Sequence, residues 1–331
     1  MILVVSLSPS WQRTLVFPKF SPGEVNRATD VIETASGKGV NVARVATQLG
    51  AKVRLLTTAG GPRGTLFRKA LKIDGVPATI ISTAGETRLC QTLIGLANTP
   101  HLNPLPQGER KYEVTLHPLP LRERAGVRGS VPIITELVEP PATLNPAEVD
   151  AVLSAYSRAL RKASLVVLIG SIPKGCGNGF YAKLTRQANR LHIPVLVDAQ
   201  RELLIQGIRE HPSLVKINRA ELAEATGTTN LAGGVKQLTK WGAKQIVITQ
   251  GSKPAIAFDG KGSWKIIPPK IDVVNSTGCG DAMMAGIATG LHQGKSLENA
   301  LKLGVACGAA NAMTVKSGDL RLRDVRKLSL P

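Results

Sequence analysis

The chain has 331 residues and a formal net charge of +19, from 42 Lys and Arg against 23 Asp and Glu. Its 43% hydrophobic content is that of a soluble globular protein, and no apolar run approaches the roughly 20 residues that span a bilayer. A basic protein attracts anions, but the Lys and Arg are scattered and aromatic residues make up only 3%, which argues against a specific nucleic-acid-binding role.

The cysteines and the N-terminus bear on the cellular compartment. Cys90, Cys176, Cys279 and Cys307 are widely spaced, with no C-x-x-C pair, and the five histidines show no ligand-like spacing. The opening M-I-L-V-V-S-L-S lacks a basic leader and predicts a buried strand rather than a signal peptide. We therefore expect reduced thiols in a cytoplasmic protein, with no zinc site and no membrane partner.

Apolar, β-rich runs alternate with helical patterns along the chain. This alternation predicts a mostly parallel sheet with helices on both faces, a fold in which ligands bind at the carboxyl ends of the strands. The expected strands are 2–7, 52–58, 79–82, 164–170, 193–198, 214–217 and 245–249. The expected helices are 39–49, 64–73, 146–162, 178–191, 219–226, 232–241, 281–293 and 297–313.

Three further segments are strand-like but have no helix between them. They span about 12–34, 86–99 and 133–140. We expect them to form a small antiparallel sheet beside the main one, where it would cover a bound ligand as a lid.

The segment 100–132 fits neither pattern. It holds six of the 21 prolines and a near-repeat, L-N-P-L-P-Q-G-E-R at 102–110 and L-H-P-L-P-L-R-E-R at 116–124. Dense proline removes backbone donors and fixes φ, which disfavours both helix and strand. We expect a disordered insertion in the lid; a Pro-rich arm that docks a partner is the alternative.

The most informative motif is V-V-N-S-T-G-C-G-D-A-M-M-A-G at 273–286. Gly278 and Gly280 allow close approach of the backbone to a ligand and unusual dihedrals. If a helix begins near Asp281, its free N–H groups favour an anion there. A phosphate cradle beside a carboxylate indicates phosphoryl transfer; the alternative is a Gly-rich helix start that Asp281 merely caps.

A second glycine-rich turn, S-G-K-G-V-N-V-A-R at 36–44, also enters a helix. Lys38 stands between two glycines and Asn41 follows one turn later, which suits a phosphate or the hydroxyls of a polar ligand. An ordinary strand–helix turn with a solvated lysine is the alternative.

A third cluster, V-K-I-N-R-A-E at 215–221, follows an expected strand. Lys216, Asn218 and Glu221 would lie at the strand's carboxyl end, where an amide and a carboxylate suit a water-mediated hold on Mg²⁺. The alternative is a capping box, with Asn218 as N-cap and Glu221 three residues later.

The ordered set of motifs resembles the PfkB (ribokinase-like) carbohydrate kinase family, in its 1-phosphofructokinase and tagatose-6-phosphate kinase branch. The resemblance covers nearly the whole chain except about 100–132, and N-S-T-G-C-G-D is close to the family's specific G-A-G-D signature. The other matching segments are M-I-L-V-V-S-L-S-P-S at the start, P-G-E-V-N-R at 22–27, T-R-L-C-Q-T-L-I at 87–94, I-T-E-L-V-E-P at 134–140, G-S-I-P-K-G at 170–175 and I-T-Q-G-S at 248–252.

The resemblance implies a single kinase domain over 1–331, with an α/β core of a mostly parallel sheet flanked by helices and a small β-sheet lid. It implies ATP as donor, Mg²⁺ as cofactor and a small-molecule sugar phosphate as acceptor. The expected reaction converts fructose 1-phosphate to fructose 1,6-bisphosphate, or phosphorylates tagatose 6-phosphate. The alternatives are 6-phosphofructokinase activity and a non-catalytic sugar-phosphate sensor. Lids often form dimer contacts in this family, which allows a homodimer.

The resemblance also assigns roles to residues. Asp281 would be the base, beside an anion hole made by the backbone of Gly278, Cys279 and Gly280. The sugar phosphate would be held by Gln12, Arg27, Lys38, Gly39, Asn41, Arg88 and Ser171. The nucleotide would lie against Lys216, Asn218, Glu221, Thr249, Gly251 and Asn311, with Asn218 and Glu221 also placing Mg²⁺ through water.

Four departures from the family pattern bear on activity. Gln12 stands where an aspartate is usual, and Ser8 where asparagine is frequent. Pro254 replaces a glycine of the nucleotide turn, and proline cannot take a positive φ. D-A-Q-R-E at 198–202 replaces D-x-S-G-E. With these changes, the protein could prefer a different acceptor or have a weaker activity than other members of the family.

Overall fold

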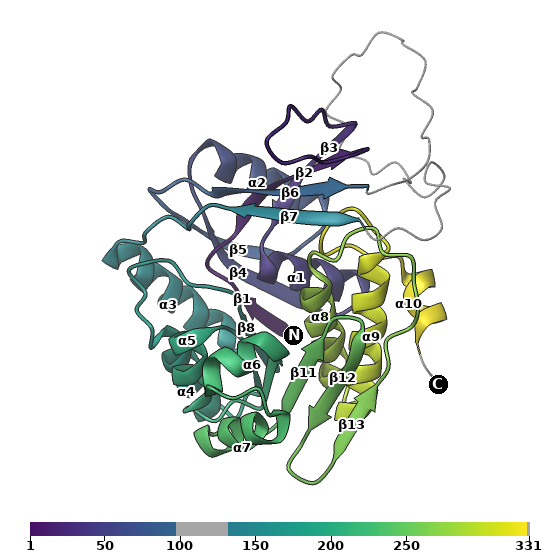
Figure 1. The fold of residues 1–331 in the computed structure, drawn as a ribbon. Coiled ribbons are helices and arrows are strands. Elements are labelled where there is room, and N and C mark those ends of the chain that lie inside the picture. The colour runs from purple at the N-terminus through teal and green to yellow at the C-terminus, as the bar shows by residue number, and fades with distance from the viewer. Residues whose placement is uncertain (97–131, 330–331) are drawn as a thin grey trace.

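The computed structural model describes residues 1–96 and 132–329, and a nine-stranded sheet forms its centre (Figure 1). Seven neighbouring strands pair in parallel, and two antiparallel strands, β12 and β13, extend one edge. In spatial order the strands are β13 (Ser263–Ile266), β12 (Lys253–Phe258), β11 (Ile246–Gln250), β10 (Leu214–Asn218), β9 (Val195–Asp198), β8 (Leu165–Ile169), β1 (Ile2–Val5), β4 (Val53–Ala59) and β5 (Ala78–Ser82).

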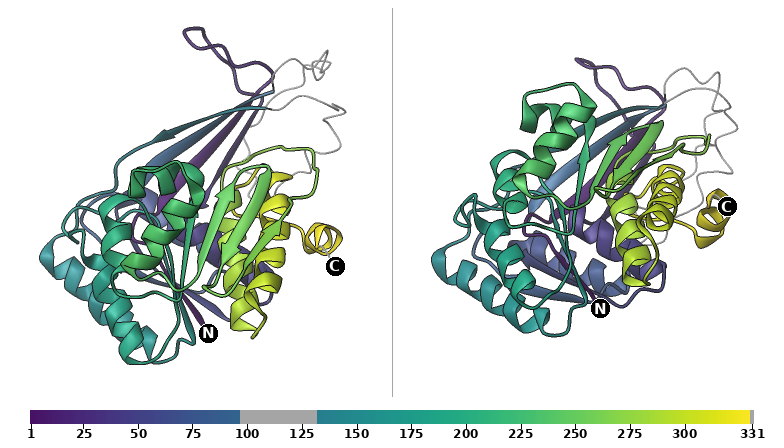
Figure 2. Two further views of the ribbon diagram at one scale, coloured as in Figure 1. Left: turned by 60° about the horizontal axis from the view of Figure 1, so that its bottom comes forward. Right: turned by 90° about the horizontal axis from the view of Figure 1, so that it is seen from below.

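Helices cover both faces of this sheet, as Figure 2 shows from two sides, and the expected α/β class is confirmed. One face packs against α1 (Lys38–Gln48), α2 (Gly61–Ile73), α8 (Cys279–His292) and α9 (Leu297–Ala312), and α10 (Leu322–Leu328) packs on α9. The other face packs against α3 (Pro146–Leu160), α4 (Phe180–Arg190), α5 (Arg201–Ile208), α6 (Arg219–Thr226) and α7 (Leu231–Trp241).

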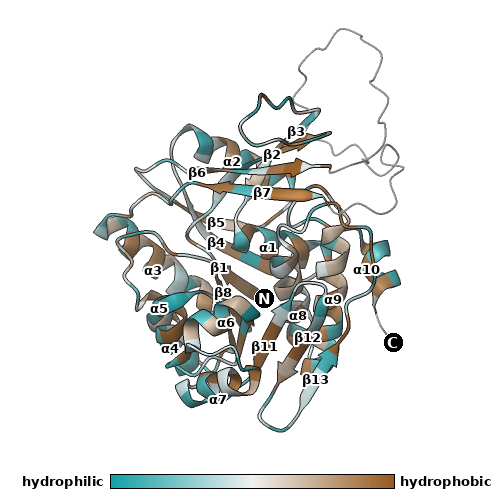
Figure 3. Ribbon diagram, in the orientation of Figure 1, coloured by the Kyte–Doolittle hydropathy of each residue, from teal (hydrophilic) through white to brown (hydrophobic). Residues whose placement is uncertain are grey.

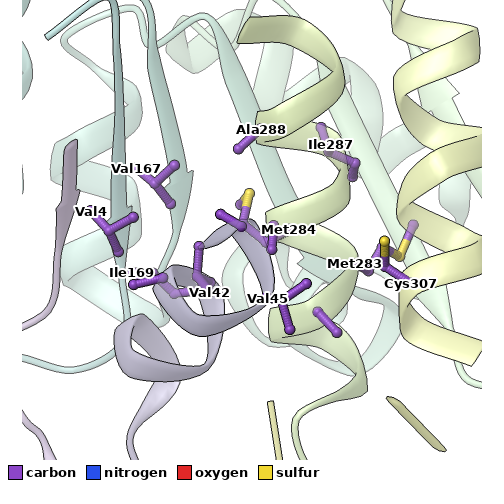
Figure 4. Packing of buried hydrophobic residues seen from close by; sticks show 14 of the residues in the cluster. Val4, Val42, Val45, Val167, Ile169, Met283, Met284, Ile287, Ala288 and Cys307 are labelled. Carbon is purple, nitrogen blue, oxygen red and sulfur yellow. The ribbon is translucent and has the colours of Figure 1, made fainter. Parts of the chain in front are cut away.

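The central strands are apolar along their whole length because both of their sides are buried. In β1, Ile2 and Val4 belong to the core on the α1 and α8 side, whereas Leu3 and Val5 belong to the core on the α3 side. Figure 4 shows the first core, where α8 packs beside α1 and the sheet. Truncating a buried Leu, Ile or Met to Ala typically costs about 2–5 kcal/mol, so this layer fixes α8 firmly beside α1.

The lid is a separate four-stranded sheet, in the order β3 (Asp30–Ser36), β2 (Ser10–Phe17), β6 (Arg88–Gly95) and β7 (Ile133–Val138). Our expectation that it is antiparallel was wrong, because β2 and β6 run parallel. The reason is topological. β2 follows β1 and β6 follows β5, and both leave the same carboxyl edge of the main sheet, so they enter the lid in the same direction.

Four elements of the structure were not expected from the sequence: the strands β12 and β13 and the helices α5 and α10. The expected insertion at 100–132 lies outside the described residues except for its last position.

All four cysteines are free, and no helix in the described ranges is long and apolar enough to cross a membrane.

Candidate active site

The loop before α8 lies at the carboxyl edge of the sheet and carries Asp281 in the helix's first turn. Gly278 is the N-cap, with a φ of +82°, and a β-carbon there would lie 2.2 Å from the hydroxyl oxygen of Ser317. Glycine is therefore required at 278 on both counts. Gly280 differs from our expectation: it lies inside the helix with no positive φ, and a β-carbon there would sit 3.5 Å from the Lys216 ammonium.

The Asp281 carboxylate is buried, with 7% of the residue exposed. Burial raises its pKa to about 6, while the charge of Lys38 and a hydrogen bond from Asn41 act in the opposite direction. The Asn41 amide nitrogen donates to Asp281 Oδ2 over 2.8 Å. A carboxylate with a pKa near neutrality, held in one orientation, has the properties of a general base.

The amide of Asn41 is itself oriented by neighbours that the sequence did not reveal. Its nitrogen also donates to Ser317 Oγ, and its oxygen accepts a long hydrogen bond from Arg44 Nη1. The guanidinium of Arg44 is almost fully buried and forms an ion pair with Asp74, 2.8 Å apart. This chain of contacts fixes which side of the Asn41 amide faces Asp281.

Three charged side chains form a second cluster beside the loop. Asp198, at the end of β9, contacts Lys216 Nζ at 2.5 Å and Lys38 Nζ at 3.4 Å. Burial alone would raise the pKa of Asp198, but the two ammonium groups outweigh it and lower the pKa. Asp198 raises the pKa of Lys38 in turn. Asp198 and Lys38 are therefore both charged at neutral pH. Asp198, the carboxylate that contacts both lysines, was not among the site residues expected from the sequence.

Two ammonium groups of this cluster act on the N-terminus of α8. The N–H groups of Gly280 and Asp281 lie in the first helical turn, where they have no intrahelical acceptor. The Lys216 ammonium approaches Gly280, and the charge of Lys38 acts on Asp281. A helix N-terminus flanked by two cations favours a phosphate group.

A cavity of about 700 Å³ lies next to this cluster, between the ends of β10 and β11. It is lined by three of the residues expected at the nucleotide, Asn218, Thr249 and Gly251, and by two cations that were not expected, Arg219 and Lys253. Gly251 has a φ of +62° in the tight turn between β11 and β12. The size and the positive lining fit a nucleotide.

The family model described as "pfkB family carbohydrate kinase" matches residues 8–117 and 141–320, well over half of the chain. The chain belongs to this family. A carbohydrate kinase transfers a phosphoryl group to an alcohol of a sugar, and the family implies ATP as donor. The cavity, the cationic cluster and the buried carboxylate adjoin one another, and they form the candidate active site of this kinase.

Individual relatives agree with this assignment. The chain is 28% identical to a tagatose-6-phosphate kinase of Staphylococcus epidermidis, over 97% of this chain and 94% of that protein. A putative phosphofructokinase of Staphylococcus aureus is 26% identical, with a TM-score of 0.72 over 99% of this chain and 96% of that one. Phosphofructokinase-2 of Escherichia coli, crystallised with substrates and products, shares the fold with a TM-score of 0.80 at 22% identity, over 99% and 98% of the two chains.

Asn218 and Glu221 form the capping box that was the alternative to a metal-binding role. Asn218 Oδ1 accepts from the N–H of Glu221, and Glu221 Oε2 accepts from the N–H of Asn218. Gln200 donates to the other carboxylate oxygen. Since each carboxylate oxygen keeps a lone pair, Glu221 still fits a water-mediated hold on Mg²⁺. Residues 1–96 and 132–329 contain no cluster of three or more His, Cys, Asp or Glu that would bind a metal directly.

Several residues of this carbohydrate kinase expected at the sugar phosphate have other partners. Gln12 is buried in the lid and donates to Thr92 Oγ1. Arg88 donates to the backbone carbonyls of Ser8, Pro9 and Glu139, so its guanidinium ties the start of β6 to the connection between β1 and β2 and to the residue that follows β7. Gly39 is buried against Ser6, whereas Arg27 and Ser171 are exposed.

The residues that depart from the family pattern occupy distinct environments. Pro254 lies in β12, beside a register irregularity, and the positive φ of the turn belongs to Gly251 instead. Proline is tolerated at such an irregularity because a ladder bond is missing there anyway. Arg201, where glycine is usual, has a φ of +53°, a strained value for a non-glycine residue.

Asn311 and Cys279 make their contacts in and around the loop before α8 rather than at the cavity. The Asn311 amide is buried, donates to the carbonyl of Thr277 and the sulfur of Cys279, and accepts from the N–H of Gly318. Asn311, which we expected at the nucleotide, does not line the cavity between β10 and β11. Burial raises the pKa of Cys279 to about 11, so its thiol stays neutral.

Proposed function

We propose that this carbohydrate kinase phosphorylates a hexose phosphate, fructose 1-phosphate or tagatose 6-phosphate, with Mg-ATP as donor. The observation that carries the proposal is the buried Asp281 carboxylate at the N-terminus of α8, flanked by the ammonium groups of Lys38 and Lys216. The tagatose-6-phosphate kinase relative supports a phosphorylated acceptor. Two ammonium groups suit a site that holds two phosphorylated ligands.

In the proposed reaction the acceptor hydroxyl donates its proton to Asp281. The hydroxyl oxygen then bonds to the γ-phosphorus of ATP as the bond to the β-phosphate oxygen breaks, which gives ADP and a bisphosphorylated sugar. The charge on the transferring phosphoryl group would be stabilised by the N–H groups of Gly280 and Asp281 and by the ammonium of Lys216. The phosphate of the acceptor sugar would be held by Lys38 and by Arg27 from the lid. Mg²⁺, when bound, neutralises charge on the nucleotide phosphates, and Glu221 would hold its water ligands.

The proposal is tested with purified protein, Mg-ATP and a panel of acceptors, by following ADP release. We expect turnover with fructose 1-phosphate or tagatose 6-phosphate and far less with unphosphorylated fructose or tagatose. Fructose 6-phosphate is the third hexose phosphate in the panel. Thermal stabilisation by a sugar phosphate without ADP release would instead identify a non-catalytic sensor, the alternative that Gln12 favours.

The lid supports a proposal about assembly. It exposes four large apolar side chains, Val31 (55%), Ile133 (54%), Leu137 (49%) and Val138 (60%), and Figure 3 shows the hydrophobic colouring of β7. Exposed apolar area of this kind favours association, so we expect two lids to pair in a homodimer. Sedimentation velocity at micromolar concentration should show a dimer that Leu137→Glu weakens. A monomer in both proteins would contradict the expectation.

A further inference from the structure

A second basic cavity lies at the opposite edge of the main sheet from the kinase site. Its volume is about 570 Å³, and it is bounded by the start of β4, by Thr79 of β5 and by the last turn of α3. Met1 also lines it, and the label N in Figure 2 marks this end of the molecule. The cavity thus lies at the amino ends of strands whose carboxyl ends face the lid.

Four cations line this cavity: Lys52, Arg54, Arg158 and Lys162. The lining contains no acidic residue. Elsewhere in the protein, the buried Arg44 and the partly buried Arg63 are paired with carboxylates. By contrast, none of these four cations forms an ion pair or a side-chain hydrogen bond with another residue of 1–96 or 132–329.

Arg54 is the least expected of the four. It lies on β4, opposite Leu3 of β1, on the sheet face where Leu3 and Leu56 pack into the α3-side core. The alternation of β4 would place an apolar side chain there, yet the position holds a partly buried arginine. An anion in the cavity would give this arginine a charged partner.

The other cations come from separate elements and converge on the same space. Arg158 lies in the last turn of α3, Lys162 lies in the turn that follows this helix, and Lys52 precedes β4. Burial, and after it the charge of Lys52, lower the pKa of the Met1 amino group, which also lines the cavity. Guanidinium groups bind phosphate oxygens in a bidentate manner, and ammonium groups add point charges.

We propose that this cavity is a second anion-binding site, which takes a small compound with two or more phosphate groups. Two guanidinium and two ammonium groups exceed what a single phosphate needs, and the volume admits a ligand no larger than a small phosphorylated metabolite. The site is separate from the nucleotide cavity, which shares none of its lining residues.

Calorimetric titration with inorganic pyrophosphate tests the proposal. The variant Arg158→Ala/Lys162→Ala removes two of the four cations. Both residues are exposed; Arg158 lies in the last turn of α3, where alanine is well tolerated, and Lys162 lies in the turn that follows the helix. The matched control is Lys236→Ala/Lys240→Ala, which removes two exposed cations at the same i, i+4 spacing on α7. Both double variants lower the net charge equally and leave the kinase site intact.

We expect pyrophosphate binding to one class of site to weaken by about tenfold or more in Arg158→Ala/Lys162→Ala, and to stay within about twofold of wild type in the control. The KM for ATP should be unchanged in both. An isotherm of Arg158→Ala/Lys162→Ala that matches wild type would overturn the proposal. So would an equal loss in the two double variants, since that would reflect general attraction by a basic protein.

Discussion

Replacing Asp281 by asparagine is expected to lower kcat by about 10²–10⁴ and, at the same time, to raise the melting temperature at neutral pH. The loss of activity follows because an amide does not accept the hydroxyl proton. The geometry should survive, since the asparagine oxygen can still accept the hydrogen bond that Asn41 donates to the carboxylate.

The gain in stability follows from the raised pKa of Asp281. In the native state this pKa is about 6, against 3.8 for an unperturbed aspartate. Between these values the native state binds more protons than the unfolded chain, so the free energy of unfolding falls as the pH rises from about 4 to 6. Above pH 6 the buried charge costs on the order of 3 kcal/mol, and asparagine removes this cost. The melting temperature should therefore rise by a few degrees.

Activity and thermal unfolding are measured on the same proteins. Wild-type kcat/KM should fall as the pH drops below about 6, and the stabilisation of Asp281→Asn should be present at pH 7.5 and lost near pH 4. Asp324→Asn is the control, because Asp324 is also 7% exposed but lies in α10. Its kcat should match wild type. Activity of Asp281→Asn within tenfold of wild type would exclude the assigned role.

Much of the fold could be predicted because its signals are local. The apolar run of β1 and the Asn218–Glu221 capping pair each depend on a few neighbouring residues. The strands β12 and β13 escaped prediction because β12 contains Pro254 and β13 is a strand of only four residues at the edge of the sheet. The parallel pairing of β2 with β6 is set by the main sheet from which both strands leave, not by their own sequences.

The candidate site also contains residues that local sequence signals reveal and residues that only the folded chain reveals. Lys38, Lys216 and Asp281 could be singled out as candidates because each stands at a recognisable junction of strand, loop and helix, and the structure brings the three together. Their partners were not, since the Lys38–Asp198 contact joins residues 160 apart and the Asn41–Ser317 contact joins residues 276 apart. A sequence shows which donors are available, but only the folded chain shows that Arg88 donates to backbone carbonyls.

Breaking the ion pair between Asp198 and Lys216 is expected to be the most destabilising charge change at the site. Their side chains are only 3% and 7% exposed, so Asp198→Asn leaves the Lys216 ammonium buried without a carboxylate. Removing one partner of a buried pair costs about 3–5 kcal/mol. Lys216→Met should cost less, because Asp198 keeps Lys38 as a partner.

Denaturant unfolding of a double-mutant cycle measures this effect. Asp198→Asn/Lys216→Met should be more stable than Asp198→Asn alone, since no buried ammonium is then left unpaired. Glu33→Gln, which breaks the more exposed Arg13–Glu33 pair, is the control and should cost less than about 1 kcal/mol. Strictly additive changes in the free energy of unfolding would show that the two buried charges do not interact.

The pH dependence gives an independent test of the same pair. The native pKa of Asp198 is lowered, so the stability it contributes is present above the pKa of an unfolded aspartate and is lost as the pH falls through the native value. The difference between wild type and Asp198→Asn should therefore shrink in acid. Asp281 shows the opposite sign, although both carboxylates are buried in one site. The physical difference is that two ammonium groups contact Asp198 directly, whereas Asp281 has an amide as its hydrogen-bond partner and stays poised to accept a proton.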